Sequence, residues 1–258
     1  MKIAVTGKGG VGKTFVSATL ACRYASEGTR TIAIDADTSP NLALTFGMTE
    51  AELATITPIA ENIPLIEEKT KTDFPGVFKL AFSVDDIIQS QSVVTSCGVS
   101  LLVMGTVRAM GTGCACPAYS VVRTLINHLM TSDKVVILDM EAGIEHLGRG
   151  TAEHVDVMLV VTDAHQASLV TAERIVRLAR DGGIPLIALV GNRVVDTEAK
   201  ERICKTAFAL QVPVAAIIPY DAEILNAGIR GISPVTLTTP ATWAVSDLKE
   251  WIEGETEK

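Results

Sequence analysis

Residues 7–14 read GKGGVGKT and directly follow a short apolar run, Ile3–Val5. They fit the pattern of a glycine, four further residues and then Gly-Lys-Ser/Thr. Glycines let the backbone curl until successive N–H groups point at phosphate oxygens, and the helix expected next adds the positive end of its dipole. The stretch therefore predicts a strand, a phosphate-binding loop and a helix, which is how a nucleotide-binding α/β fold opens.

Six more apolar runs, several rich in Val and Ile, alternate with segments of helical periodicity. These runs are Thr31–Ile34, Leu101–Met104, Val135–Leu138, Val157–Val161, Leu186–Val190 and Val214–Ile218. Strands that are apolar on both faces are typical of a parallel sheet covered by helices. We expect one doubly wound α/β domain of the P-loop NTPase type over residues 1–258, with a mostly parallel sheet of about seven strands and helices on both faces. Residues 48–98 show no clear period and are expected to form an insertion or a partner-facing segment.

The composition restricts the class of partner and the compartment. Of 258 residues, 48% are hydrophobic and 4% aromatic, and the formal net charge is −8. This charge disfavours nucleic acid or an anionic membrane as the main partner. No apolar run is long enough to span a bilayer, and the apolar stretch at the N-terminus is too short for a signal peptide. We therefore expect a cytoplasmic protein in which the cysteines stay reduced.

The phosphate loop also predicts individual roles. Lys13 places a cation on the β- and γ-phosphates, and Thr14 offers its hydroxyl to Mg²⁺. Lys8 is unusual, because an ordinary phosphate loop does not need a second lysine after its first glycine. The residues expected to contact the nucleotide are Gly9, Gly10, Val11, Gly12, Lys13, Thr14 and Phe15.

Acidic residues end two of the expected strands. Asp35 and Asp37 follow the second strand, at the edge where α/β sheets bind ligands. Asp139 ends the buried run VVILD, which is the Walker B arrangement for holding Mg²⁺ or its bound water. Four residues later, Gly143 can present its N–H to the γ-phosphate and so couple the nucleotide state to the loop behind it.

Two further segments are expected to receive the base. Asn192 in VGNRV can donate to and accept from an adenine edge, and Arg193 follows it. Pro219 and Asp221 lie in IPYD, after the last apolar run. The NKxD string of guanine-binding proteins is absent, so ATP is favoured over GTP.

Residues 111–119 read GTGCACPAY and place Cys114 and Cys116 one residue apart. Pro117 suits the first turn of a helix, whose positive end favours thiolates. Two thiolates fill half of a four-coordinate site, and a two-fold axis would complete it with Zn²⁺ or Ni²⁺. A redox-active or purely structural pair is the alternative. Of the remaining cysteines, Cys22 and Cys204 are expected to be core residues, and Cys97 is expected to lie in the core or at a strand edge.

The string KGGVGKT resembles the deviant Walker A loop of the family that contains septum-site and plasmid-partition ATPases and the nitrogenase iron protein. The resemblance implies that Lys8 reaches across a dimer to the partner's nucleotide. It also implies that Asp37 positions or activates the attacking water, that Asn192 contacts adenine, and that Pro219 and Asp221 belong to a second adenine-facing loop.

Within that family, DAD, DMEAG and GCACP together look like the accessory ATPases that help insert nickel into carbon monoxide dehydrogenase. This resemblance implies an ATP-hydrolysing, nucleotide-gated homodimer that uses ATP, Mg²⁺ and Zn²⁺ or Ni²⁺. The catalytic subunit of the dehydrogenase would be its client. Two alternatives remain: maturation of the related acetyl-CoA synthase, and a partition or septum-site type of ATPase, which the acidic C-terminal helix disfavours.

Overall fold

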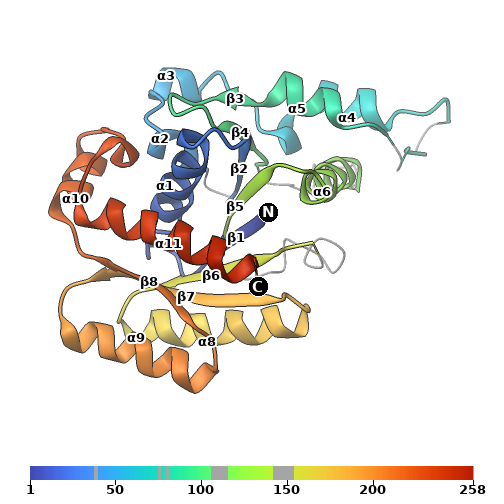
Figure 1. Ribbon diagram of the computed structural model, residues 1–258. Helices are drawn as coiled ribbons and strands as arrows, with labels where there is room; N and C mark the ends of the chain where they lie inside the picture. The colour runs from blue at the N-terminus through green and yellow to red at the C-terminus, as the bar shows by residue number, and fades with distance from the viewer. Residues whose placement is uncertain (38–39, 75–76, 80–81, 106–115, 142–153, 258) are drawn as a thin grey trace.

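Eight strands form one sheet in the order β3-β4-β2-β5-β1-β6-β7-β8 (Figure 1). The computed structural model describes residues 1–37, 40–74, 77–79, 82–105, 116–141 and 154–257. All neighbouring strands pair in parallel except β3, which is antiparallel to β4. The strands are β1 (Lys2–Thr6), β2 (Thr31–Ala36), β3 (Val93–Val94), β4 (Ser100–Val103), β5 (Val135–Met140), β6 (Val157–Thr162), β7 (Leu186–Val194) and β8 (Val214–Pro219).

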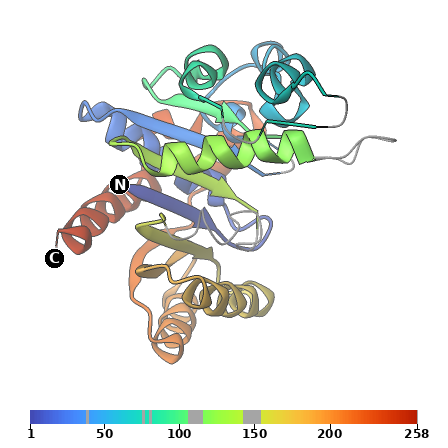
Figure 2. The same cartoon turned by 90° about the vertical axis from the view of Figure 1, so that its right-hand side faces the viewer.

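Helices cover both faces of this sheet (Figures 1 and 2). Alternate residues of each strand point to opposite faces, so Ile3 packs in a cluster with α1 and α11, whereas Ala4 packs in another with α6 and α8. The helices are α1 (Lys13–Ser26), α2 (Leu42–Thr45), α3 (Glu50–Leu53), α4 (Ile63–Thr70), α5 (Asp85–Gln91), α6 (Cys116–Met130), α8 (Gln166–Asp181), α9 (Thr197–Leu210), α10 (Ala222–Ile229) and α11 (Pro240–Thr256), with 3₁₀ turns η1 (Ile59–Glu61) and η2 (Pro234–Thr236).

The predicted fold class is confirmed: a single α/β domain with a mostly parallel sheet and helices on both faces. All seven expected strands are present. The structure adds one further strand, β3, which was not predicted because its two residues are too few to show a period. The helix expected after the cysteine pair is α6, and it begins at Cys116, one residue before Pro117. None of the described helices combines the length and apolar character that a membrane span requires.

Residues 48–98 contain the short elements α3, η1, α4, α5 and β3. Ile59, Leu65 and Ile87 from this segment are buried in the same cluster as the apolar face of α6. The short helices explain why the sequence shows no sustained period here, since none of them contributes more than two apolar residues to the core and α3 contributes no buried residue. At its end, β3 adds to the β4 edge of the sheet.

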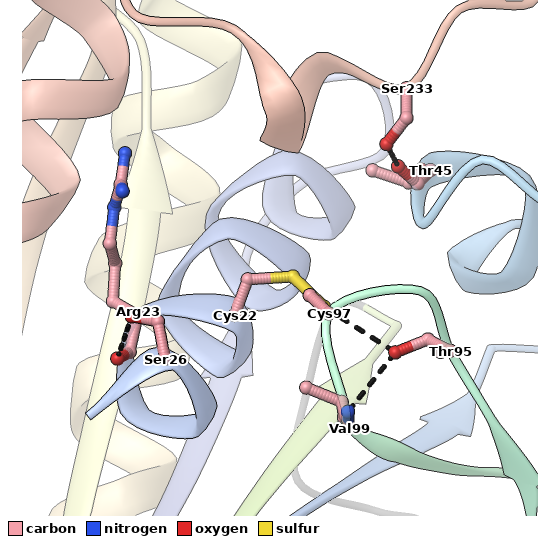
Figure 3. The surroundings of a disulfide bond; sticks show 8 residues. All are labelled: Cys22, Arg23, Ser26, Thr45, Thr95, Cys97, Val99 and Ser233. Carbon is pink, nitrogen blue, oxygen red and sulfur yellow. Dashed lines mark hydrogen bonds between the residues drawn. A yellow bond between two sulfur atoms is a disulfide. The ribbon is translucent and has the colours of Figure 1, made fainter. Parts of the chain in front are cut away.

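One prediction about the cysteines is wrong. Cys22 on α1 and Cys97 in the turn between β3 and β4 form a disulfide, with Cα atoms 5.6 Å apart (Figure 3). Both were expected to be reduced, Cys22 in the core and Cys97 in the core or at a strand edge. Cys22 is indeed buried, but Cys97 is only partly buried and faces it across the helix–turn contact. Because 75 positions separate the two residues, no local pattern indicates the pairing. Cys204 is a free cysteine.

Candidate functional site

The phosphate loop connects the end of β1 to the start of α1, and its shape depends on glycine. A Cβ at Gly7 would lie 2.2 Å from the carbonyl oxygen of Val161 in neighbouring β6, and Gly7 has a φ of 150°. Gly10 and Gly12 have φ angles of 85° and 93°, which side-chain-bearing residues rarely adopt. The loop can therefore lie flat against β6 and curl toward the N-terminus of α1.

The two lysines of this loop lie in different environments. Lys13 is the first residue of α1 and is only 7% exposed, whereas Lys8 is exposed. Thr14 follows Lys13 in the first turn of the helix, where backbone N–H groups are free to meet an anion. The two lysines therefore differ in exposure: Lys13 is enclosed at the start of α1, and Lys8 lies at the surface of the loop.

Two carboxylates are buried side by side beneath the loop. Asp35 in β2 and Asp139 in β5 are register partners, and they are 0% and 1% exposed. Burial and the negative charge of Asp35 raise the pKa of Asp139 to about 7, although hydrogen bonds from Thr14 and Ser17 oppose this rise. Burial likewise raises the pKa of Asp35 to about 6. Such a pair favours a bound cation, which would neutralise charge that the fold otherwise disfavours.

The hydroxyl of Ser17 donates to Oδ1 of Asp139 at 3.0 Å, and Ser17 is fully buried. Sequence reasoning missed Ser17. The available signal was its spacing, because a residue four positions after Lys13 lies on the same face of α1. Ser17 therefore fixes one oxygen of the Walker B carboxylate.

Asp35 organises the loop that carries Asp37. Its carboxylate accepts hydrogen bonds from the backbone N–H groups of Leu42 at 2.9 Å and of Asp37 at 3.3 Å. Asp37 itself is only partly buried, at the carboxyl end of β2. The two acids thus differ in environment: Asp35 holds the backbone, and the Asp37 carboxylate lies closer to solvent.

These residues fit Mg²⁺ and a nucleoside triphosphate. Mg²⁺ prefers hard oxygen ligands and keeps several waters, and the Thr14 hydroxyl and the Asp139 carboxylate supply oxygens within the same hydrogen-bonded group. The fold therefore brings together the curled loop, the buried ammonium group of Lys13 and the buried carboxyl group of Asp139 at the carboxyl ends of the strands.

A cavity of about 550 Å³ opens beside the loop and is suited to the base. Its lining includes Gly12 and Phe15 from the start of α1. The structure brings four of the predicted base-site residues to this cavity and adds several that sequence reasoning missed. The predicted residues are Asn192, Arg193, Pro219 and Asp221, and the missed ones include Thr45, Tyr220, Ile224, Leu225 and Ile229.

Asp221 uses its carboxylate within the protein. Oδ1 accepts from the backbone N–H groups of Glu223 at 2.9 Å and Ile224 at 3.4 Å, which caps α10. Burial would raise the pKa of Asp221, but hydrogen bonds from Thr239 and from backbone N–H groups outweigh it and lower the pKa. Asp221 therefore shapes the cavity by holding α10, which supplies part of its apolar wall.

Several predicted residues lie outside the described part of the chain. Cys114 falls within residues 106–115 and Gly143 within residues 142–153. Cys116 is described only as the first residue of α6. Among the residues that the structure describes, no three His, Cys, Asp or Glu side chains form a group that could hold a metal ion.

Comparisons with known proteins agree with this geometry. Residues 2–235 match the family described as the CobQ/CobB/MinD/ParA nucleotide binding domain. An ATP-binding protein of Methanocaldococcus jannaschii is 40% identical over 98% of this chain and 97% of its own length. The carbon monoxide dehydrogenase accessory protein CooC of Rhodospirillum rubrum is 43% identical over 90% of this chain and 89% of its own length.

Among solved structures, a chain of the MinC:MinD cell division protein complex of Aquifex aeolicus superposes with a TM-score of 0.70. It is 20% identical, and the match covers 98% of this chain and 95% of that one, so it supports the fold alone. The family match, the curled loop and the buried Walker B acid lead to one conclusion. The chain belongs to the CobQ/CobB/MinD/ParA nucleotide-binding family and is a P-loop ATPase that uses ATP and Mg²⁺.

Proposed function

We propose that this ATPase assists nickel insertion into the active-site cluster of carbon monoxide dehydrogenase as a nucleotide-gated homodimer. The observation that carries the proposal is the 43% identity with the R. rubrum accessory protein, which extends over 90% of the chain. The acidic net charge of −8 favours this role over one on DNA or an anionic membrane.

Hydrolysis is assigned to residues of the site described above. Lys13 stabilises charge on the transferred phosphoryl group, and Thr14 and Asp139 would hold Mg²⁺, which supplies further charge neutralisation. Ser17 keeps the Asp139 carboxylate in place through the 3.0 Å hydrogen bond. Asp37 positions the attacking water, and its partly exposed location suits a group that meets solvent. Gly143 contributes its backbone N–H to the γ-phosphate.

The site is completed by a second copy of the chain. Lys8 is exposed on the loop, whereas Lys13 is buried, so Lys8 is available to a nucleotide on a partner. Replacement of Lys8 by alanine should weaken ATP-dependent dimerisation and turnover more than nucleotide binding. Sedimentation with a non-hydrolysable ATP analogue measures the first effect. Equal dimerisation and equal turnover in both proteins would count against the assignment.

The cysteine pair is proposed to bind one Zn²⁺ or Ni²⁺ per dimer, through Cys114 and Cys116 of both chains. The start of α6 at Cys116 supports this, because a helix N-terminus favours thiolates. Metal titration of Cys114→Ala and Cys116→Ala, with and without nucleotide, tests the site, and Cys204→Ala is the matched control. Two metals per dimer in the wild type would contradict a shared site.

The client is tested in cells. A strain that lacks this protein should make carbon monoxide dehydrogenase polypeptide of low activity, and excess nickel should restore that activity. Normal dehydrogenase activity in the deletion strain at limiting nickel would contradict the proposal. If acetyl-CoA synthase activity alone falls, the client is the synthase instead.

A further inference from the structure

We infer that Asn192 is a positioning residue for the phosphate loop, and not only a contact for the base. Its side-chain Nδ2 donates to the carbonyl oxygen of Val11 at 2.7 Å, across 181 positions of sequence. Asn192 is 4% exposed, so this hydrogen bond is shielded from water. One buried amide therefore joins the cavity suited to the base with the loop suited to the phosphates.

The side-chain amide of Asn192 lies close to both residues of the Val11–Gly12 peptide. A Cβ at Gly12 would lie 2.3 Å from Nδ2 of Asn192, so only glycine permits this approach. Within the loop, the N–H of Val11 donates to the carbonyl of Lys8 at the longer distance of 3.4 Å. The bond from Asn192 is thus the shorter of these two restraints on the loop near Val11.

The orientation of Asn192 follows from an irregularity in β7. The pairing of β7 with β8 shifts register between Gly191 and Val194, and Arg193 has a φ of 55°. Such a bulge turns a strand locally and redirects its side chains. Here the amide of Asn192 reaches the loop, while Arg193 remains exposed along the cavity.

The chemical consequence lies in the peptide between Val11 and Gly12. A trans peptide is planar, so its carbonyl and its N–H point in opposite directions. By holding the Val11 carbonyl, Asn192 fixes the Gly12 N–H in the direction away from itself. Without this restraint the peptide could rotate and present a carbonyl dipole where an anion must bind. Asn192 therefore favours phosphate binding even when no base is present.

A ligand without a base separates this role from base recognition. Calorimetric titration with Mg²⁺-tripolyphosphate and with Mg²⁺-ADP should be compared for wild type, Asn192→Ala and Asn192→Asp. We expect both variants to bind tripolyphosphate about tenfold or more weakly, as for a lost buried hydrogen bond. Asn192→Asp should be the weaker binder, because a carboxylate oxygen would face the Val11 carbonyl. Weaker ADP binding with unchanged tripolyphosphate affinity would overturn the inference.

Asn226→Asp is the matched control, since it makes the same change at an exposed position on α10. It should leave tripolyphosphate binding unchanged, and an equal loss of affinity in Asn226→Asp would mean that the effect comes from net charge.

If both Asn192 variants fail to fold, the wild type still provides the test. With ¹⁵N-labelled asparagine, tripolyphosphate alone should shift the side-chain amide resonances of Asn192, and unshifted resonances would overturn the inference. No client protein is needed, so the outcome is independent of the proposed cellular role.

Discussion

The two ends of helix α1 are fixed in different ways. Its first residue, Lys13, continues from the phosphate loop, where glycines allow the backbone to pack against β6. Toward its other end, Cys22 is joined by a disulfide to Cys97 in the β3–β4 turn. The first end depends on the backbone shape of the phosphate loop and on two buried acids, Asp35 and Asp139, whose charge destabilises the protein when no cation is bound. The second end depends on a covalent bond that closes a long loop, so the two ends should respond to different perturbations.

The largest effect is expected at the loop end. In Gly7→Ala the new Cβ would lie 2.2 Å from the Val161 carbonyl in a central strand that cannot move aside. Backbone strain and overpacking together should lower the free energy of unfolding by about 5 kcal/mol. Gly9→Ala is the control, because no atom lies within 4 Å of a Cβ there. Denaturant unfolding measures both, and similar values for the two variants would mean that packing against β6 does not fix the loop.

The disulfide end should show the next largest effect. A cross-link that spans 75 positions restricts the unfolded chain and should stabilise the oxidised protein by about 4 kcal/mol in the chain-entropy account. Cys22→Ser with Cys97→Ser should remove this stabilisation, and dithiothreitol should do the same to the wild type. Cys204→Ser, at the free cysteine, is the control. If reductant does not change the unfolding midpoint of the wild type, the edge of the sheet is held by packing alone.

The buried acids at the loop end predict a pH dependence in nucleotide-free protein. The pKa values of Asp139 and Asp35 are raised to about 7 and about 6, from about 4 in an unfolded chain. Between pH 4 and 7 the folded state therefore binds more protons than the unfolded state, and stability falls as the pH rises. We expect the free energy of unfolding to be about 4 kcal/mol higher at pH 5 than at pH 8.

Asp139→Asn should flatten this dependence, because the neutral side chain removes one titrating group and the repulsion it exerts on Asp35. Asp133→Asn makes the same change at a surface position that is 74% exposed and should retain the full slope. Stability that does not fall from pH 5 to pH 8 would show that neighbouring positive groups compensate the charge of both carboxylates in the folded protein.

The same contrast separates what the sequence could predict from what it could not. The phosphate loop, the seven longer strands and the Walker B acid each have a local pattern, in glycine spacing or in a buried apolar run. The Cys22–Cys97 disulfide and the bond from Asn192 to Val11 join residues 75 and 181 positions apart, and neither has a local pattern. The sequence predicted that Asn192 contacts the base, whereas the contact of its amide with the phosphate loop is visible only in the folded structure.

The smallest expected effect sharpens the account of the disulfide end. Thr95 is 5% exposed, its hydroxyl accepts from the N–H of Val99 at 3.1 Å, and its own N–H donates to the Val99 carbonyl at 2.9 Å. The hydroxyl also lies 3.4 Å from the sulfur of Cys97. Thr95→Ala should lower the free energy of unfolding by about 1 kcal/mol, through the lost hydrogen bond.

Thr55→Ala is the control within the same segment, because Thr55 is exposed and its hydroxyl donates only to the nearby Glu52 carbonyl. Combining Thr95→Ala with Cys97→Ser tests whether turn and cross-link act together. If the turn holds Cys97 in position for Cys22, part of the cost of Thr95→Ala comes from a less favourable cross-link. This part is absent once Cys97 is replaced, so the two substitutions should cost less together than the sum of their separate effects. Strict additivity would mean that the turn and the cross-link stabilise this edge independently.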